Sequence, residues 1–441
     1  FFVKSFLLHI FLVAIIAFVS INFWENPIYD MMTNLTHATM KGSDDIALVM
    51  IDNKSIDSYR WPWARSLYGE VFDYLNKYTN AKVVVFDSIF TNLDKNNPPS
   101  SDNYFFDTVK NTDNFIGGYM ALSDKYENPE LGSNYDEKFQ RKFSIEIADK
   151  RTKNNSRYSN YNSLTMFPDK YFDAQKNVGS VNFTLNPVDG ILREATDLIS
   201  YNDNFYPSLA LRAYMLSNKT NKLTLTNNYL IVDKTGLKIP TYTHNGDIRH
   251  NMKFCEFLPN SDYSHKTYSA IDLINSDRLM KSGKKPIISP SEFDNKIIFV
   301  GANALAVEDV LKTTIATKHP GVDIQATILD NFLNNQFIVK FNSFSNLVTI
   351  ILISIATFLI IRFFAFLPSL LTLIGFAILY FAFCIICFNN NIVPLVITPL
   401  AVQLSTMIFG YSYRFILEGK NKEKIKNAVG KYLSQDIMKN V

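Results

Sequence analysis

The sequence contains only three cysteines among 441 residues, too few for a domain built on disulfides. Cys255 is the one cysteine outside an apolar segment, so the polar middle of the chain cannot close an internal disulfide. Cys384 and Cys387 lie within an apolar run, where cysteine behaves as a small hydrophobic residue. The six histidines are scattered, and none has the spacing of a zinc site. We therefore expect no metal ligands and no cofactor on this chain.

The sequence also lacks a strong excess of charge of either sign. The formal net charge is +3 at pH 7, which gives no reason to expect a nucleic-acid partner. The apolar runs contain few charged residues and none that suggests an ion path, which argues against a transporter. No carboxylate pair comes with a recognisable acid–base partner, so we expect no catalytic residue.

Long apolar runs are the strongest feature that the sequence does have. Residues 6–23, FLLHIFLVAIIAFVSINF, are long enough to cross a bilayer, and no small-residue cleavage site follows them. This predicts an uncleaved signal anchor. After a long polar stretch the chain is apolar again over residues 344–416, which divide into spans at 344–361, 366–388 and 392–415. Because backbone groups in lipid must be satisfied internally, we predict four transmembrane helices in contact with membrane lipid.

The basic residues near these spans predict their orientation. They are Lys4, Arg362, Arg414, Lys420, Lys422, Lys424 and Lys426. The opposite connections, residues 22–27 and 389–391, lack lysine and arginine. By the positive-inside rule both termini lie in the cytoplasm and the polar middle lies outside it. The predicted parts are a signal anchor (1–23), an outer domain (24–343), three further spans (344–416) and a cytoplasmic coupling helix (417–441).

Three short β-branched runs in the outer domain predict strands buried on both faces of a parallel sheet. They are IALVMID ending at Asp52, AKVVVFD ending at Asp87, and KIIFVGAN passing through Gly301. Amphipathic helices are predicted at residues 66–78 and 321–335, between and after these strands. A strand–helix–strand crossover of this length is typical of an α/β layered domain with a mostly parallel central sheet.

Weaker patterns predict the remaining elements of the outer domain. We expect strands at residues 115–122, 178–183, 196–201 and 252–258, and a helix at 206–216. Residues 125–160 are polar and poorly periodic, which predicts a long surface insertion.

A candidate ligand site follows from the strand ends. In open α/β sheets ligands bind at the carboxyl ends of the strands, where Asp52, Asp87 and Gly301 stand. The loop after the first strand adds the side chains of Arg60, Trp61, Trp63 and Arg65. Carboxylates, guanidiniums and an indole face could hold a small polar or zwitterionic ligand. The structural alternative is that the tryptophans pack the domain, while Arg60 or Arg65 pairs with Asp87 or Asp52 as an internal strut.

Several longer stretches resemble the second of the CHASE families, which are extracellular sensory domains associated with cyclases and histidine kinases. They are RWPWARSLYGEVFDYL (60–75), AKVVVFDSIF (81–90), VGSVNFTLNPVDGILREATDLISYNDNFYPSLAL (178–211), GLKIPTYTHNGDIRHNMKF (236–254) and KIIFVGANALAVEDVLKTTIATKHPGVDIQATILDNFL (296–333). Together they cover most of residues 44–340 in the family's order, with Thr314 where a proline is expected. The resemblance implies an anchor helix before the sensor, three membrane helices after it, reception of an unidentified signal outside, and an output domain inside.

The last residues carry a second resemblance. VGKYLSQDIMKNV is similar to the segment that introduces the catalytic domain of class III nucleotide cyclases. Lys431, Tyr432, Leu433 and Ser434 match that segment and are expected to couple the signal, while Gln435 stands where proline is usual. This implies a membrane-bound adenylate cyclase that works as a homodimer. The catalytic domain, with its ATP and divalent metal, would follow this chain, which by itself should make no cyclic nucleotide.

Two other output classes stay open at this point. The sensor could be coupled to a protein kinase, or the chain could be a membrane-anchored binding module without enzymatic output. The family resemblance also implies a bacterial inner membrane with the sensor in the periplasm.

Overall fold

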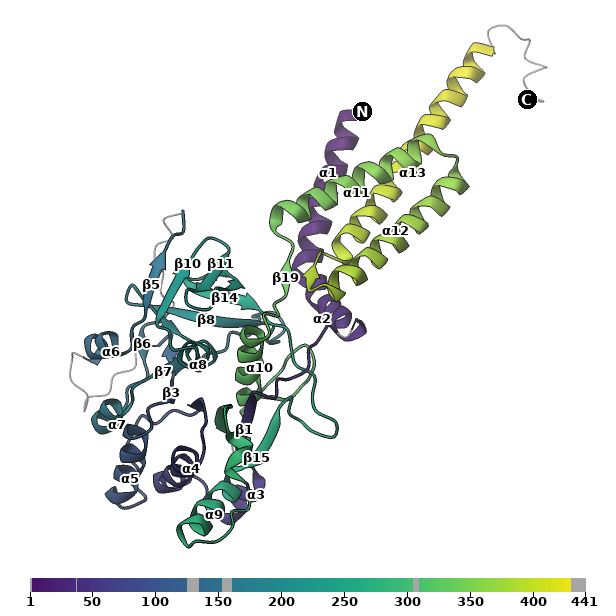
Figure 1. The fold of residues 1–441 in the computed structure, drawn as a ribbon. Helices are drawn as coiled ribbons and strands as arrows, with labels where there is room; N and C mark the ends of the chain where they lie inside the picture. Colours follow the sequence, from purple (N-terminus) through teal and green to yellow (C-terminus); the bar gives the residue numbers. More distant parts are fainter. Residues whose placement is uncertain (1, 37, 125–134, 153–160, 304–308, 430–441) are drawn as a thin grey trace. The chain divides into compact units, whose positions relative to one another are not determined.

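The computed structural model describes residues 2–36, 38–124, 135–152, 161–303 and 309–429 (Figure 1). The chain forms two compact units, which are described separately. One is Thr39–Ile338, called here the sensor unit. The other joins Phe1–Ala38 to Val339–Val441 and is called here the membrane unit.

A six-stranded parallel sheet forms the centre of the sensor unit (Figure 1). Its strands follow the order β15-β1-β16-β2-β3-β7. Their bounds are β1 (Ile46–Ile51), β2 (Val83–Phe86), β3 (Phe115–Tyr119), β7 (Val178–Ser180), β15 (Lys266–Ser269) and β16 (Ile297–Ala302). β1, β2 and β16 are buried along their whole length, as their continuous apolar sequences predict.

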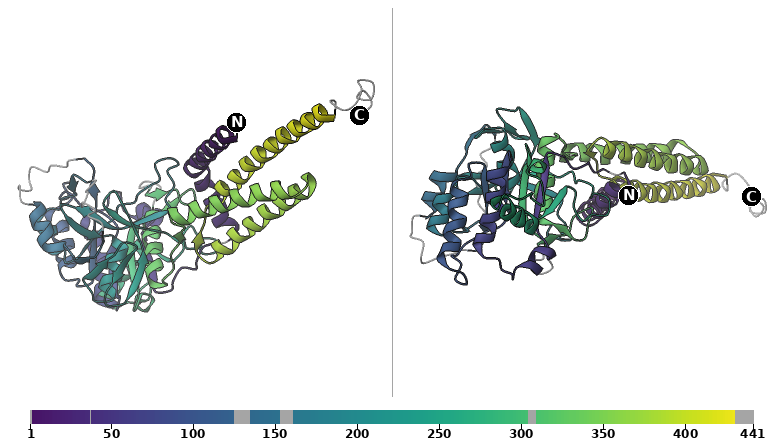
Figure 2. Two further views of the ribbon diagram at one scale, coloured as in Figure 1. Left: turned by 90° about the horizontal axis from the view of Figure 1, so that it is seen from above. Right: turned by 60° about the horizontal axis from the view of Figure 1, so that its bottom comes forward.

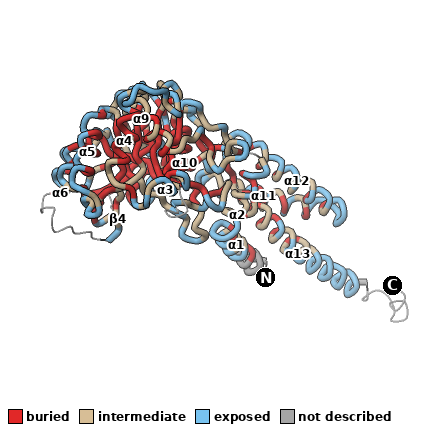
Figure 3. Tube along the Cα trace, turned by 90° about the horizontal axis from the view of Figure 1, so that it is seen from below, coloured by how far each residue is buried: buried red, intermediate tan, exposed pale blue. Residues whose placement is uncertain are grey.

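Helices cover both faces of this sheet, and Figure 3 shows the buried core between the layers. Alternate strand residues face opposite sides: Val49 and Val84 belong to one apolar cluster, Leu48 and Val83 to the other. The first cluster packs under α3 (Asn53–Ser58), α4 (Arg65–Tyr78), α5 (Pro99–Lys110), α7 (Asp169–Ala174) and α9 (Ala270–Lys281). The second packs under α8 (Leu209–Ser217) and α10 (Gly321–Leu333). The predicted α/β layers with a mostly parallel central sheet are therefore confirmed.

Two four-stranded sheets and two short strand pairs accompany the central sheet in the described part of the sensor unit. One four-stranded sheet is antiparallel, with the order β13 (Tyr242–His244), β14 (Asp247–Asn251), β8 (Glu194–Tyr201) and β9 (Asn204–Pro207). The other has the order β12 (Leu237–Pro240), β11 (Tyr229–Val232), β10 (Lys222–Leu225) and β5 (Glu146–Asp149). The strand pairs are β4 (Ala121–Leu122) with β6 (Ser163–Leu164) and β17 (Val310–Leu311) with β18 (His319–Pro320), and the further short elements are α6 (Tyr135–Phe143) and the 3₁₀ turn η2 (Pro290–Phe293).

The structure differs from three of the weaker predictions. Residues 252–258 form no strand, because β14 ends at Asn251 and the residues after it bond to separate segments of the chain. The helix predicted at 206–216 begins at Leu209, and Tyr206 belongs to β9. The polar insertion contributes to the core, since α6 buries Phe139 in the first apolar cluster.

The membrane unit is helical, and Figure 2 shows its long helices side by side. Its elements are α1 (Phe2–Val19), the π-helical turn η1 (Ser20–Trp24), α2 (Glu25–Leu35), α11 (Ser343–Phe363), α12 (Phe366–Asn389) and α13 (Ile397–Val429), with β19 (Val339–Lys340) paired to β20 (Ile392–Val393). Among the described residues three helical stretches are long and apolar enough to cross a membrane: His9–Leu35, Ser343–Phe363 and Phe366–Asn389. The prediction of four such helices is corrected to three.

α13, which contains the predicted fourth span, is not among the helices apolar enough to cross a membrane, because polar residues occur within it. Gln403 lies within it and donates to the backbone oxygen of Leu373 at 2.9 Å, and Arg414 donates to the backbone oxygen of Phe364 at 2.7 Å. At its start the Glu25 carboxylate accepts hydrogen bonds from the amides of Val396 and Thr398 at 2.9 and 2.6 Å. α13 therefore runs alongside the apolar helices with its polar groups bonded to them.

Candidate functional site

Three of the predicted site residues meet at one edge of the parallel sheet. β16 lies between β1 and β2, with Gly301 opposite Met50 and Val300 opposite Phe86. Asp52 follows β1 and Asp87 follows β2, so both carboxylates lie at the carboxyl ends of these strands, beside Gly301.

At this edge the Asp52 carboxylate is hydrogen-bonded to two serines of the sensor unit. Its Oδ1 accepts hydrogen bonds from the Ser55 amide at 2.9 Å, the Ser55 hydroxyl at 2.7 Å and the Ser269 hydroxyl at 2.8 Å. The carboxylate thereby caps the first turn of α3 and joins it to the end of β15. These bonds explain an acidic residue after β1 without a ligand.

Gly301 is explained by a close contact between helix and strand. A Cβ atom at this position would lie 3.0 Å from both Cβ and Cγ2 of Val322, at the start of α10. Glycine here lets α10 approach β16, which fixes the position of this helix on the sheet.

Asp87 is the unusual group at this edge. Its amide donates to the Val300 oxygen, but its Oδ2 is buried without a hydrogen-bond partner among the described residues. Burial raises the pKa of Asp87 to about 8, and the Asp309 carboxylate adds to the rise. A carboxyl group that stays protonated near neutral pH can donate a hydrogen bond as well as accept one. Asp87 is therefore suited to contact a polar ligand.

The two predicted arginines do not pair with these carboxylates in the described structure. Arg65 lies 3.3 Å from the centre of the Phe90 ring and 3.9 Å from the Asp102 carboxylate. Arg60 is exposed, and Trp61 packs partly buried against the first apolar cluster. The alternative strut, in which Arg60 or Arg65 pairs with Asp87 or Asp52, is therefore not formed among the described residues, and Arg65 contacts Asp102 instead.

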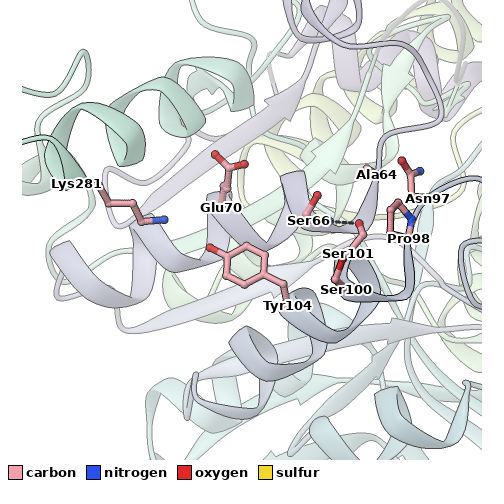
Figure 4. A pocket seen from close by; sticks show the side chains of 9 residues that line it. All are labelled: Ala64, Ser66, Glu70, Asn97, Pro98, Ser100, Ser101, Tyr104 and Lys281. Carbon is pink, nitrogen blue, oxygen red and sulfur yellow. Dashed lines mark hydrogen bonds between the residues drawn. The ribbon is translucent and has the colours of Figure 1, made fainter.

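A polar pocket lies over the ends of α4, α5 and α9 (Figure 4). It has a volume of about 520 Å³ and is lined by Ala64, Ser66, Glu70, Asn97, Pro98, Ser100, Ser101, Tyr104 and Lys281. Its charged groups already have partners: Glu70 binds Arg278 through both oxygens, and Lys281 binds Asp277 at 2.6 Å. The pocket is large enough for a small molecule, but its charges stabilise the contact between α4 and α9. The sequence did not indicate it, because the lining residues come from three separate segments.

A third site joins the two points where the chain enters and leaves the sensor unit. Residues 251–256, called here the junction segment, contact both points. Met40, just inside the unit, donates to the Phe254 oxygen at 2.9 Å and accepts from the Glu256 amide at 2.8 Å. At the other end of the same segment, the Ile338 amide donates to the Asn251 oxygen at 3.3 Å.

Asn331 of α10 clamps the middle of the junction segment. Its side chain accepts from the Lys253 amide at 2.9 Å and donates to the Lys253 oxygen at 2.7 Å. Asn331 is fully buried, and so is the adjacent Asp330. The last turns of α10 thus hold the segment to which both chain connections are bonded.

A buried histidine–aspartate network lies beside this clamp. His265 contacts Asp323 through Nδ1 at 3.0 Å and Asp330 through Nε2 at 2.8 Å, while His319 Nε2 lies 3.0 Å from Asp323. Burial alone would lower the pKa of His265, but its hydrogen bonds to the two carboxylates hold the pKa well above the usual value. Burial alone would raise the pKa of Asp323, but His265 and His319 hold it well below its usual range.

No sequence pattern indicated this network. His265 lies 58 residues from Asp323 and 65 from Asp330, so no local spacing connects them. Only the packing of α10 against the start of β15 brings the three side chains together.

The sequence of the chain matches the model of one known domain family. The profile of the CHASE2 domain matches residues 8–360, which is most of the chain. This chain belongs to the CHASE2 family. CHASE2 is an extracellular sensor domain of signalling receptors. No curated protein and no solved structure matches the chain.

The CHASE2 match extends beyond the sensor unit at both ends. It begins within α1 and reaches into α11, so it includes both chain connections held by the junction segment. The predicted coupling residues Lys431, Tyr432, Leu433 and Ser434 lie outside the described residues.

Proposed function

We propose that this chain is the sensory and membrane module of a bacterial receptor, in which the junction segment transmits the signal. The observation that carries this proposal is that one segment of a CHASE2 sensor bonds to both of its connections, at Met40 and at Ile338. A change that moves α10 against the sheet moves the Asn331 clamp, and with it both connections. A ligand can drive this change only by binding one arrangement more tightly than the other.

We propose that the stimulus is a polar molecule bound at the carboxyl edge of β1, β16 and β2. Asp87 has an unpaired buried oxygen there, and Gly301 beside it contacts the first turn of α10. A ligand that hydrogen-bonds to Asp87 would therefore act close to the helix that carries Asn331. Asp52 would contribute by holding the shape of the edge, while Arg60, Trp61 and Arg65 lie in the loop that follows it.

The orientation proposed for the membrane unit has its basic end in the cytoplasm. Within this unit, α13 begins at the Glu25 cap and reaches the connection between α11 and α12, where Arg414 bonds to Phe364. Arg362 belongs to the same end, and Lys420, Lys422, Lys424 and Lys426 follow along α13. The positive-inside rule assigns this end to the cytoplasm. Because α13 runs beside the three apolar helices between their two ends, we propose that it crosses the membrane with them in spite of its polar residues, with the sensor in the periplasm of a bacterial inner membrane.

We propose that the output is an adenylate cyclase, which converts ATP to cyclic AMP, and that it works as a homodimer. The support is the similarity of residues 431–434 to the segment that introduces class III catalytic domains, which form their active sites between two subunits. α13 leads directly toward that segment. The ATP and the divalent metal would be bound by the output domain.

The test is cyclic AMP production in bacterial membranes that lack other adenylate cyclases. The product of the natural gene should make cyclic AMP from ATP and a divalent metal, whereas residues 1–441 alone should make none. Phosphorylation of protein without cyclic AMP would replace the cyclase by a kinase. The absence of both activities would leave a membrane-anchored binding module.

A further inference from the structure

Three hydrogen-bond donors converge on one carboxylate oxygen in the network beside the clamp. Asp330 Oδ2 lies 2.8 Å from His265 Nε2, 2.9 Å from the Ser43 amide and 3.3 Å from the thiol of Cys255. The three side chains are fully buried. Two of these donors, an imidazole nitrogen and a thiol, become good metal ligands once they lose a proton.

The spacing of these groups fits a single small metal ion. Cys255, His265 and Asp330 each offer one ligand atom, and these atoms all lie within 4.8 Å of one another. Zinc bound tetrahedrally at about 2.0–2.3 Å holds its ligand atoms roughly 3.3–3.8 Å apart. The site fits once His265 Nε2 and Asp330 Oδ2, now 2.8 Å apart, separate slightly.

The other ring nitrogen of His265, Nδ1, already has a carboxylate partner of the kind that metal-ligating histidines have. Nδ1 bonds to Asp323 Oδ1, and the second oxygen of Asp323 bonds to the Ser264 amide and to His319 at 3.0 Å each. A carboxylate on the far nitrogen of a ligating histidine fixes the ring and raises its basicity. This arrangement leaves Nε2 directed at Asp330.

A further buried oxygen lies next to the thiol. The Thr327 hydroxyl is fully buried and has no conventional hydrogen-bond partner among the described residues. Burial raises the pKa of the Cys255 thiol, and the nearby Thr327 hydroxyl offsets part of that rise. An unpartnered polar group of this kind could contact a metal-bound thiolate or a fourth ligand.

We propose that Cys255, His265 and Asp330 form a binding site for a zinc-like divalent metal ion, with Asp323 orienting His265. The binding step replaces two protons, one from the Cys255 thiol and one from His265 Nε2, by one M²⁺ ion. The cluster of imidazolium, carboxylate and thiol has no net charge, and the metal with imidazole, carboxylate and thiolate has none either. Metal binding therefore adds no net charge to the buried interior.

The metal would link the junction segment, through Cys255, to α10, through Asp330. The site goes beyond the proposed receptor function and does not depend on it. It also departs from the sequence-based expectation of no metal ligands, because the three residues are brought together only by folding.

The experiment uses the full chain in detergent micelles after removal of bound metal. Added Co²⁺ should give a thiolate-to-cobalt charge-transfer band and the visible bands of four-coordinate cobalt, and one equivalent of Zn²⁺ should displace it. Cys255→Ser should abolish the charge-transfer band. Asp323→Asn should weaken Zn²⁺ affinity by about 10–100-fold while keeping that band.

The paired variant Cys384→Ser/Cys387→Ser is the matched control, because it leaves Cys255 as the one remaining thiol. It should bind cobalt as the parent chain does. The proposal is overturned if the folded parent chain gives no charge-transfer band. It is equally overturned if the band survives Cys255→Ser and is lost in the control. Circular dichroism of each variant shows whether it is folded.

Discussion

At the scale of single residues, two carboxylates of the sensor unit have pKa values that are shifted in opposite directions. Asp323 accepts hydrogen bonds from a backbone amide and two imidazoles, so its pKa lies well below the usual range. Asp87 has a buried oxygen without a partner, so burial raises its pKa instead. The difference follows from the donors present, since burial alone would raise both pKa values.

Asp87→Asn should change how stability depends on pH. The folded protein keeps a proton on Asp87 up to a pKa of about 8, whereas the unfolded chain releases it near the ordinary value of 3.8. The free energy of unfolding therefore falls with rising pH between these values, by at most about 1.4 kcal/mol per pH unit. The variant should lose this slope and be more stable than the parent chain at about pH 8.

Urea unfolding across this pH range measures the effect. Asp113→Asn is the control, because its carboxylate side chain is 92% exposed. An unchanged slope in Asp87→Asn would show that Asp87 is ionised in the folded protein throughout.

Arg65→Ala should destabilise the sensor unit by about 2–3 kcal/mol. The substitution removes the guanidinium stacked on Phe90 and leaves Asp102, which is 4% exposed, without its cationic partner. Arg60→Ala is the matched control and should cost less than about 0.5 kcal/mol, because Arg60 is exposed. Equal losses in the two variants, measured by chemical unfolding, would contradict the assignment of Arg65 to a packed contact.

At the scale of elements, the sequence correctly predicts those strands and helices that a local pattern of apolar residues determines. Continuous β-branched runs identified β1, β2 and β16, and helical periodicity identified α4 and α10. A strand was predicted at residues 252–258, which overlap the junction segment and include Met252 and Phe254. Both are indeed buried, but their backbone bonds to Arg193 and Met40 rather than to a neighbouring strand. Which segment supplies the partner is decided by tertiary packing, which local patterns do not encode.

The same limit applies to the candidate site. The sequence predicted that Asp52, Asp87 and Gly301 lie at the carboxyl ends of parallel strands, and in the structure they lie at one edge of the sheet. It could not reveal that Asp52 is fully engaged with Ser55 and Ser269, or that Arg65 turns to Phe90.

Gly301→Ala should destabilise the packing of α10 on β16 by about 1–3 kcal/mol. The added methyl group would lie 3.0 Å from Val322, closer than two carbon atoms normally approach. Val322→Ala removes Cγ2 but keeps Cβ, the other carbon at 3.0 Å, so the double variant should recover only part of the loss. Additive effects in a double-mutant cycle, followed by thermal unfolding, would show that Val322 is not the obstacle.

At the scale of the whole molecule, the proposed signal path depends on a few hydrogen bonds at the junction segment. Lys253 and Cys255 bond to adjacent residues of α10, Asn331 and Asp330. The same segment bonds to Ile338 through Asn251 and to Met40 through its last residues. The segment therefore couples α10 to both connections without belonging to either.

Asn331→Ala should loosen this coupling. Loss of the two bonds to Lys253 leaves partly buried backbone groups without these partners, with an expected cost of about 1–2 kcal/mol. Hydrogen exchange of peptides covering residues 251–256 should accelerate more than exchange of the central strands. Asn334→Ala is the control, since Asn334 is exposed and its side chain has a longer contact of 3.4 Å with Asp330. Equal exchange rates in both variants would argue against the clamp.

The proposed homodimer is tested by the mass of the purified chain. Light scattering in detergent and in nanodiscs should give two chains per particle. A chain that stays monomeric in both would count against transmission through a change in dimer packing, whatever the output domain.

The cap at the start of α13 limits how that helix can move. Glu25 accepts hydrogen bonds from the amide of Val396, just before the helix, and from the amide of Thr398 in its first turn, so sliding α13 along its axis by one turn would break both bonds. The backbone amides lie only about 2 Å from the helix axis, so turning the helix in place displaces them far less. If α13 carries the proposed signal, the Glu25 bonds predict that the helix turns about its axis rather than slides along it.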